Sequence, residues 1–215
     1  GASGGIGAAV CRNLCESGVE VIGVSRRRPS GWSSPNYRHL VLDLLQRASF
    51  TELISAANNM GDAHLRMLIH GAAILHSVPF KEISEGQGAD MLKLNLMVPV
   101  WLTRGLLPWL ESANQAHTVF ISSMAGYQFS QKYTGLTIYG LTKSGITGLT
   151  EALAAEYAGT SLRFNALALG AVRTAMLEEA FPGYKGGVSP ELMAEYISSF
   201  SQNAHKVLNG KIIPV

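Results

Sequence analysis

The fold is decided by the stretch GASGGIG at residues 1–7, which leads into a helical pattern at residues 5–16. Its glycines, Gly1, Gly5 and Gly7, let the backbone turn tightly and approach a ligand closely. The free N–H groups at the start of the helix, together with the helix dipole, form a site for phosphate. No Lys-Ser/Thr pair follows the glycines, which excludes a P-loop. A plain loop-to-helix turn is the alternative.

Beyond this loop, short runs rich in Val, Ile and Leu alternate with longer helical patterns. These patterns predict strands at residues 19–24, 38–42, 65–70, 118–122, 162–169 and 211–215, and helices at 5–16, 49–58, 89–110, 137–157 and 190–200. Pro99 and Pro108 are expected to kink or divide the third helix. Because the strands are apolar on both faces, we predict a doubly wound parallel sheet with helices on each side, in three α/β/α layers.

The glycine loop has no strand in front of it. In a βαβ unit the first strand aims such a loop, whereas here Gly1 opens the sequence. We therefore expect residues 1–215 to form a single domain that lacks its first strand.

The composition narrows the class of protein. Lys and Arg total 17 and Asp and Glu 15, a net charge of +2, which gives no case for a nucleic-acid or membrane partner. No apolar run reaches the ~18–20 residues of a membrane span, and no signal peptide opens the chain. Cys11 and Cys15 are the only cysteines, so a disulfide-rich scaffold is excluded and two buried thiols are expected. A cytoplasmic location is expected, and no metal site is predicted.

The residues that follow the predicted strand at 19–24 bear on cofactor choice. In dinucleotide folds this place meets the adenosine ribose, where an acid favours NAD and a nearby Arg accommodates the 2′-phosphate of NADP. Here Ser25 is followed by Arg26, Arg27 and Arg28, and the nearest acid, Glu20, lies at the opposite end of the strand. Since Arg pairs well with a phosphate dianion, we predict NADP(H) over NAD(H). A solvated basic turn is the alternative.

A tyrosine and a lysine in the segment IYGLTK, residues 138–143, are candidates for acid–base chemistry. Tyr139 and Lys143 are four residues apart and share a helix face. A nearby ammonium favours the phenolate and lowers the pKa of the phenol from near 10. Ser123 follows a predicted strand at its carboxyl end, where α/β folds bind ligands. A surface Tyr-Lys pair and a capping serine are the alternatives.

Taken in order, these motifs resemble those of the short-chain dehydrogenase/reductase family. After the glycine loop and the Ser-Arg strand end come LDL at residues 42–44, KLNL at 93–96, ISSMAG at 121–126, YGLTK at 139–143 and RFNALALGAVRT at 163–174. The resemblance runs from residue 1 to about residue 174. It implies a Rossmann-type fold and an enzyme that transfers hydride between NADP(H) and a small-molecule carbonyl or secondary alcohol.

The resemblance also implies roles for single residues. Tyr139 would be the general acid–base, and Lys143 would lower its pKa and hold the nicotinamide ribose. Ser123 would bind the substrate carbonyl, and Asn95 would complete a water-mediated proton path to the lysine. The residues implied in cofactor binding are Gly1, Ser3, Gly5, Ile6, Gly7, Ser25, Arg26, Asp43, Leu44, Gly71, Ala72, Tyr139, Lys143, Gly170, Val172 and Thr174.

The sequence departs from the family pattern in three places. His70 stands where the family has asparagine, and it is either a core histidine or an adenosine contact. Leu169 replaces a proline. The stretch between Ser123 and Tyr139 is longer than usual, which should alter one wall of a substrate pocket lined by residues 75–80, 128–136 and 181–189.

Other functions remain open at this point. A 3-oxoacyl-thioester reductase of fatty-acid synthesis is a second enzymatic possibility. A catalytically silent NADP-binding regulator and a homologue crippled by the missing strand are the non-enzymatic ones. The intact set of Asn95, Ser123, Tyr139 and Lys143 argues against the regulator. The resemblance also implies a homodimer or homotetramer.

Overall fold

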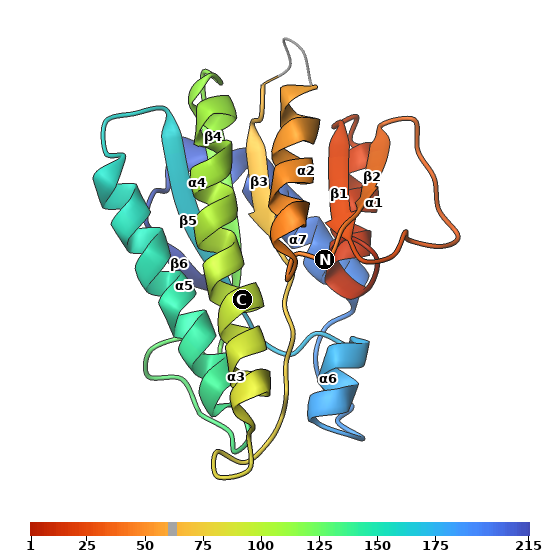
Figure 1. Cartoon of the computed structure of the whole chain (residues 1–215), viewed down its shortest axis with the longest axis vertical. Coiled ribbons are helices and arrows are strands. Elements are labelled where there is room, and N and C mark those ends of the chain that lie inside the picture. The colour runs from red at the N-terminus through yellow and green to blue at the C-terminus, as the bar shows by residue number, and fades with distance from the viewer. Residues whose placement is uncertain (60–63) are drawn as a thin grey trace.

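The computed structural model describes residues 1–59 and 64–215 (Figure 1). Its strands are β1 (Val21–Ser25), β2 (Tyr37–Val41), β3 (Met67–His70), β4 (Ala116–Ser123), β5 (Leu162–Leu169) and β6 (Ile212–Pro214). Its α-helices are α1 (Gly5–Glu16), α2 (Arg47–Asn58), α3 (Glu85–Leu92), α4 (Val98–Glu111), α5 (Thr137–Glu156), α6 (Ala175–Ala180) and α7 (Pro190–Asn203). In the part of the chain that is described, no helix is both long and apolar enough to cross a membrane.

All strand pairs are parallel. β1 pairs with β2, and the other strands form a second sheet in the order β3, β4, β5, β6. Helices α1 and α7 pack on one face with a core that includes Val119 and Leu167. Helices α2, α4 and α5 pack on the other face around Phe120 and Phe164. This arrangement confirms the predicted doubly wound, Rossmann-type α/β fold, and β5 has the predicted bounds.

The third predicted helix, residues 89–110, is divided, but not at its prolines. It starts earlier, as α3, because Ser84 and Gln87 form a capping box. A π-helical turn over Lys93–Met97 then separates α3 from α4. Pro99 stands in the first turn of α4, where the missing N–H costs no helical hydrogen bond, and Pro108 lies inside α4. Such π-turns frequently occur at functional sites.

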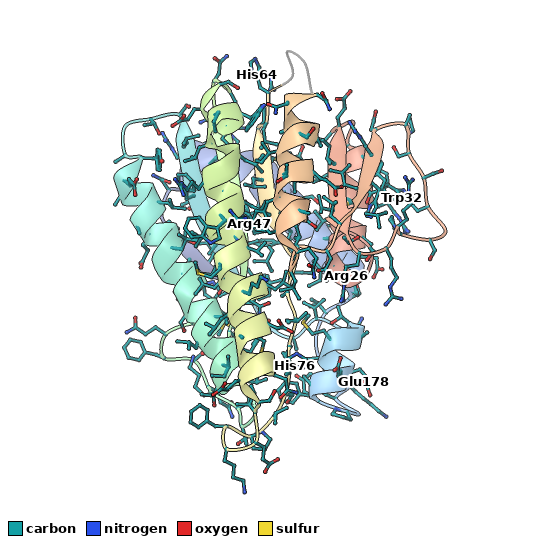
Figure 2. All side chains as sticks on the ribbon, in the orientation of Figure 1. Arg26, Trp32, Arg47, His64, His76 and Glu178 are labelled. Atoms are coloured by element: carbon teal, nitrogen blue, oxygen red, sulfur yellow. The ribbon has the colours of Figure 1, made fainter. Side chains whose placement is uncertain are left out.

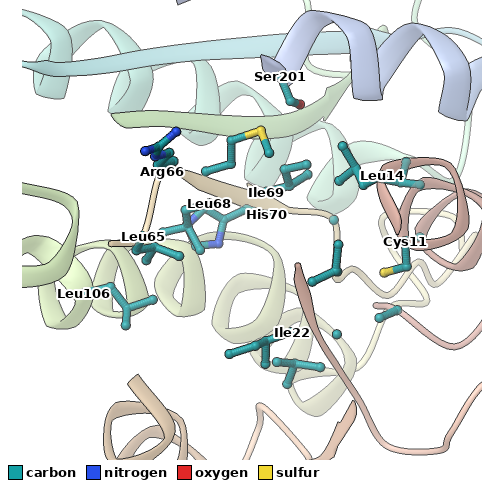
Figure 3. Close-up of a pocket in the computed structure, with 18 of the residues that line it drawn as sticks. Cys11, Leu14, Ile22, Leu65, Arg66, Leu68, Ile69, His70, Leu106 and Ser201 are labelled. Carbon is teal, nitrogen blue, oxygen red and sulfur yellow. The ribbon is translucent and has the colours of Figure 1, made fainter. Parts of the chain in front are cut away.

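A cleft of about 960 Å³ separates the edge of β1 from the edge of β3 (Figure 3). Mainly apolar side chains line it, among them Cys11, Leu14, Ile22, Leu68, Ile69 and Leu106. The nitrogen of Gly1 donates a hydrogen bond to the Val24 carbonyl over 2.8 Å, and the N–H of Ala2 donates to the same oxygen. The first residues therefore lie along the carboxyl end of β1, beside this cleft.

Candidate active site

The glycine loop packs closely against the segments that follow β3 and β5. A Cβ on Gly7 would clash with the Gly1 carbonyl, and one on Gly1 would lie 2.9 Å from the Gly71 carbonyl oxygen. Gly5 has a φ of +50°, a region that favours glycine. A Cβ atom added to Gly5 would lie 3.2 Å from Thr174 Cγ2. The structure thus brings these predicted cofactor residues together.

The start of α1 is open to an anion. Its N-cap, Gly4, supplies no side-chain hydrogen bond to the helix, and the half-buried Ser3 and Ile6 flank it. The first N–H groups of a helix have no partner within the helix and carry its positive dipole end. A loop in which close backbone contacts leave no room for a side chain at Gly1 or Gly7 therefore fits a pyrophosphate group.

The remaining predicted cofactor residues are held by contacts within the protein. The N–H of Gly170 donates to the Val215 carbonyl over 2.8 Å, and Val172 is buried and forms a bridge with Val188. Ala72 follows Gly71 and packs beside a small core cluster to which Leu44 belongs. Leu44 also lines the cleft between β1 and β3.

Asp43 and Ser25 both take part in turns. Asp43 Oδ1 accepts a hydrogen bond from the N–H of Leu45 over 3.0 Å. Ser25 Oγ donates to the Arg27 carbonyl over 2.8 Å and lies 3.2 Å from His39 Nε2. The buried Ser25 hydroxyl is thus engaged by the protein, while the side chain of Arg26 is exposed at the end of β1 (Figure 2).

The residues predicted as catalytic converge at the carboxyl end of β4. Ser123 is the last residue of β4, and Tyr139 and Lys143 lie one turn apart on α5. Lys143 Nζ donates a hydrogen bond to the Ile121 carbonyl over 2.9 Å and lies 5.5 Å from the centre of the Tyr139 ring. The Ser123 side chain lies near enough to the Tyr139 phenol to lower its pKa. A hydroxyl, a phenol and an ammonium therefore share one site.

Burial governs the charges of this group. It raises the pKa of Tyr139 to about 12, although the Ser123 side chain acts in the opposite direction. It also lowers the pKa of Lys143 to about 8. The predicted lowering of the phenol pKa by Lys143 is therefore not found. Desolvation of the phenolate is the largest cause of the rise, and Lys143 is itself only 3% exposed.

Asn95 lies in the π-turn and is buried. Its Oδ1 accepts a hydrogen bond from the N–H of Ile74 over 2.9 Å, and its Nδ2 donates to the Ile74 carbonyl over 2.8 Å. The same Nδ2 donates to Thr142 Oγ1 over 3.3 Å. Asn95 thus ties the segment after β3 to the helix that carries Tyr139. The proton path that the sequence predicts for Asn95 stays a prediction.

Glycines allow the loop after β4 to lie directly on α5. A Cβ on Gly126 would clash with the backbone of Lys143, and one on Gly140 would lie 2.9 Å from the Ala125 carbonyl oxygen. Ser122 Oγ adds a hydrogen bond to the Lys143 carbonyl over 2.9 Å. These contacts fix the distance between the end of β4 and the face of α5 that bears Tyr139.

The three segments predicted to line a substrate pocket meet one another. The N–H of Val78 donates to the Gly135 carbonyl over 3.2 Å, and Ser77 Oγ donates to the Ala180 carbonyl over 3.4 Å. The rings of Tyr133 and Phe181 lie edge to face with centres 5.7 Å apart. Figure 2 labels His76, in the segment after β3, and Glu178, on α6.

His70 is half-buried and lines the cleft between β1 and β3. Its ring stacks on Phe120 with centres 5.0 Å apart, and its Nε2 lies 2.9 Å from Thr103 Oγ1. Burial lowers its pKa to about 3. Of the two readings of His70, these contacts favour the core histidine.

Two features of the site have no counterpart in the sequence prediction. Helix α6 was not predicted, although Thr174 caps it by accepting a hydrogen bond from the N–H of Leu177; the pattern Thr-x-x-Leu before an acidic turn is its only local signal. The contact between Asn95 and Ile74 uses backbone atoms of Ile74. Because the partner atoms belong to the backbone, this contact requires no particular residue type at position 74, and the sequence gives no signal for it.

The chain is similar to known proteins in sequence and in fold. The sequence model of the family described as short chain dehydrogenase matches residues 1–185. Protein FixR of Bradyrhizobium diazoefficiens is 27% identical over 234 residues, which cover 100% of this chain and 83% of that protein.

Two solved structures resemble the chain over its whole length. The 3-ketoacyl-(acyl-carrier-protein) reductase from Brucella melitensis, complexed with NADH, has a TM-score of 0.90 at 20% identity and is covered over 93% of its chain. At that identity the likeness shows the fold alone. A short chain dehydrogenase from Shigella flexneri, complexed with NADP, has a TM-score of 0.87 at 25% identity and is also covered over 93%. With the family match spanning most of its residues, the chain belongs to the short chain dehydrogenase family.

Proposed function

We propose that the chain is an NADP(H)-dependent oxidoreductase that transfers hydride between the nicotinamide and a carbonyl or secondary alcohol. One observation carries this proposal: Ser123, Tyr139 and Lys143 meet at the carboxyl end of β4, where parallel α/β folds bind ligands. A phenol between a hydroxyl and an ammonium is an arrangement suited to moving one proton to or from an oxygen atom.

In this proposal each side chain has one task during carbonyl reduction. The nicotinamide cofactor supplies the hydride. Tyr139 is the protonated acid that donates to the carbonyl oxygen, and its raised pKa keeps it protonated at neutral pH. Ser123 donates a hydrogen bond to the same oxygen. Lys143, held by the Ile121 carbonyl, places positive charge beside the phenolate that forms.

The preference for NADP(H) rests on the basic turn after β1. Arg26, Arg27 and Arg28 are exposed, and among the described residues the one ion pair joins Lys81 and Glu82 instead. A charged 2′-phosphate would find free guanidinium groups there, and each charge-assisted hydrogen bond is worth about 1.5–3 kcal/mol. NADP in the Shigella flexneri relative is in keeping with this choice.

The test is a screen of ketones, aldehydes and a 3-oxoacyl thioester with NADPH and NADH, read by loss of cofactor absorbance. We expect turnover with NADPH and at least tenfold tighter binding of NADPH than of NADH, about the worth of one charge-assisted hydrogen bond. Arg26→Ala should remove most of this difference. Arg104→Ala, an exposed arginine that contacts Trp101 on α4, is the control and should keep it. Preference for NADH in the wild type would refute the cofactor assignment.

The same screen separates the enzyme from a silent NADP-binding regulator. A regulator would bind NADPH but turn over no member of the panel. Turnover of the thioester alone would instead select the 3-oxoacyl reductase. Each of these outcomes is measured with the wild-type chain.

A further inference from the structure

A chain of hydrogen bonds runs from β2 to the turn after β1. Tyr37 and His39 are two residues apart on β2 and therefore point to the same face. Tyr37 Oη lies 2.7 Å from His39 Nδ1, and His39 Nε2 lies 3.2 Å from Ser25 Oγ. Ser25 Oγ in turn donates to the Arg27 carbonyl over 2.8 Å. The chain links three side chains to the backbone of the basic turn.

The donors and acceptors allow one direction along this chain. A serine hydroxyl has one hydrogen, and here it goes to the Arg27 carbonyl, so His39 Nε2 must carry a hydrogen and donate to Ser25 Oγ. His39 Nδ1 then accepts from the Tyr37 hydroxyl. This assignment requires a neutral imidazole. Burial is the largest cause that lowers the pKa of His39, and it outweighs hydrogen bonding to the backbone at Ser25 and Arg27, which raises the pKa; the net lowering favours the neutral ring.

Packing holds the far end of the chain in place. Gly23 lies opposite His39 in the parallel register of β1 and β2. A Cβ on Gly23 would clash with the hydroxyl of Tyr37, so the missing side chain makes room for the phenol. The Tyr37 ring also packs against Trp32, with centres 4.5 Å apart. Figure 2 shows Trp32 in the loop between β1 and β2. Arg26 is the first residue of this loop.

We propose that His39 is a positioning residue for cofactor discrimination: by donating to Ser25 Oγ, it directs the serine hydroxyl to the Arg27 carbonyl and sets the turn from which Arg26 reaches the 2′-phosphate of NADP(H). The proposal rests on the proposed preference for NADP(H). His39 itself is 8% exposed and acts through Ser25, so it needs no contact with the cofactor. Without its donor, the Ser25 hydroxyl is free to rotate among its staggered positions.

The proposal makes the two ring nitrogens unequal. In His39→Gln the amide nitrogen can reach the place of Nε2 and still donate to Ser25. In His39→Asn the shorter amide reaches only the place of Nδ1, on the side of Tyr37. The two variants are therefore matched in polarity and differ in whether they keep the hydrogen bond to Ser25 Oγ.

The experiment measures the dissociation constants of NADP⁺ and NAD⁺ by titration calorimetry, with no turnover involved. The readout is the ratio of the NAD⁺ constant to the NADP⁺ constant. We expect the ratio to fall about fivefold in His39→Asn, the worth of one hydrogen bond, while NAD⁺ binding changes by less than about twofold. We expect His39→Gln to keep the wild-type ratio. Thermal midpoints of both variants are measured alongside.

Each result decides between the alternatives. Equal ratios in the wild type, His39→Gln and His39→Asn would overturn the role of His39, and so would an equal loss in both variants, which a merely structural histidine would produce. Failure of the proposed function appears elsewhere, as a wild-type ratio near one or as an Arg26→Ala variant with an unchanged ratio. A wild type that favours NADP⁺, an Arg26→Ala that loses this preference and a His39→Asn that keeps it would refute the His39 proposal alone.

Discussion

Lys143 Nζ donates a hydrogen bond to the Ile121 carbonyl and lies 5.5 Å from the centre of the Tyr139 ring. Burial gives the two groups pKa values of about 8 and about 12. Below pH 8 the lysine is therefore charged and the phenol protonated, which is the pair that carbonyl reduction needs. Above pH 8 the lysine loses its charge while the phenol keeps its proton.

We therefore expect the rate of NADPH-dependent reduction to be level below pH 8 and to fall above it, with one group titrating near 8. The measurement is kcat against pH for the best carbonyl of the screen. Thermal midpoints over the same pH range separate this fall from unfolding. A rate that rises between pH 8 and 10 would contradict the assignment, because it would require the phenolate as the active form.

Replacing Tyr139 by Phe removes the hydroxyl and keeps the buried ring. Turnover should fall by about two or more orders of magnitude, as expected when a general acid is lost, while folding and NADP⁺ binding should remain. Lys143→Met should lower turnover and also weaken NADP⁺ binding, because the family resemblance implies that Lys143 holds the nicotinamide ribose as well as acting on Tyr139. Steady-state rates and calorimetric binding constants check both. Near wild-type reduction by Tyr139→Phe would show that another hydroxyl donates the proton.

Two alanine substitutions in the glycine loop differ in the room that the surrounding atoms leave for a Cβ atom. A Cβ on Gly7 would clash with the Gly1 carbonyl, whereas one on Gly4 meets nothing within 4 Å. Gly4 also has an extended backbone that any residue adopts. Gly7→Ala should therefore abolish NADP⁺ binding and lower the thermal midpoint, and Gly4→Ala should leave both nearly unchanged. Equal binding by the two variants would show that the close turn is not needed.

Helices and strands bounded by glycines at both ends were predictable from the sequence. Helix α1 starts in the glycine loop and ends before Gly18, whose φ of +80° favours glycine. β5 lies between the turn at Gly159 and Gly170. The break between α3 and α4 was not predictable, because a π-turn changes the hydrogen-bond partners of Asn95 and its neighbours without requiring a particular residue.

Some features of the candidate site were also predictable from the sequence, and others were not. The spacing of Tyr139 and Lys143 placed these two residues on one helix face, because the helical period is local. Ser123 was joined to them by the family resemblance. The raised pKa of Tyr139 was missed because burial depends on tertiary packing. The link from His39 to Ser25 was missed as well, since it needs the register between two strands.

His117 in β4 is buried as a neutral ring. Its Nδ1 donates to the Ser201 carbonyl over 2.9 Å, and its Nε2 accepts from Asn165 Nδ2 over 2.9 Å. A second proton would face the Asn165 amide, and burial lowers the pKa to about 4. The unfolded chain takes up this proton near pH 6.5. The free energy of unfolding should therefore decrease as the pH falls from 6.5 to 4.

The variant His117→Asn keeps a donor for the Ser201 carbonyl and cannot titrate. The unfolding free energy is measured by urea unfolding at a series of pH values. Between pH 4.5 and 6.5, its slope against pH should be smaller in His117→Asn than in the wild type, by the amount that corresponds to about one fewer proton taken up on unfolding. His70, whose pKa burial lowers to about 3, contributes equally to both proteins and cancels. An unchanged slope would mean that His117 is charged in the folded chain.

The cleft between β1 and β3 has the shape of a site for one more parallel strand. Among the described residues neither β1 nor β3 has a partner strand on this side, so both present unpaired N–H and C=O groups. A Val- and Ile-rich strand joined to Gly1 would pair with both edges, bury its side chains against Leu14 and Ile69, and aim the glycine loop. We expect such an extension of about five residues to raise the thermal midpoint, at about 2–4 °C per kcal/mol gained, and to tighten NADP⁺ binding. The control carries Asp at alternate positions of the same extension, which burial would penalise. Equal midpoints and equal NADP⁺ binding in the two extended proteins would show that no strand enters the cleft.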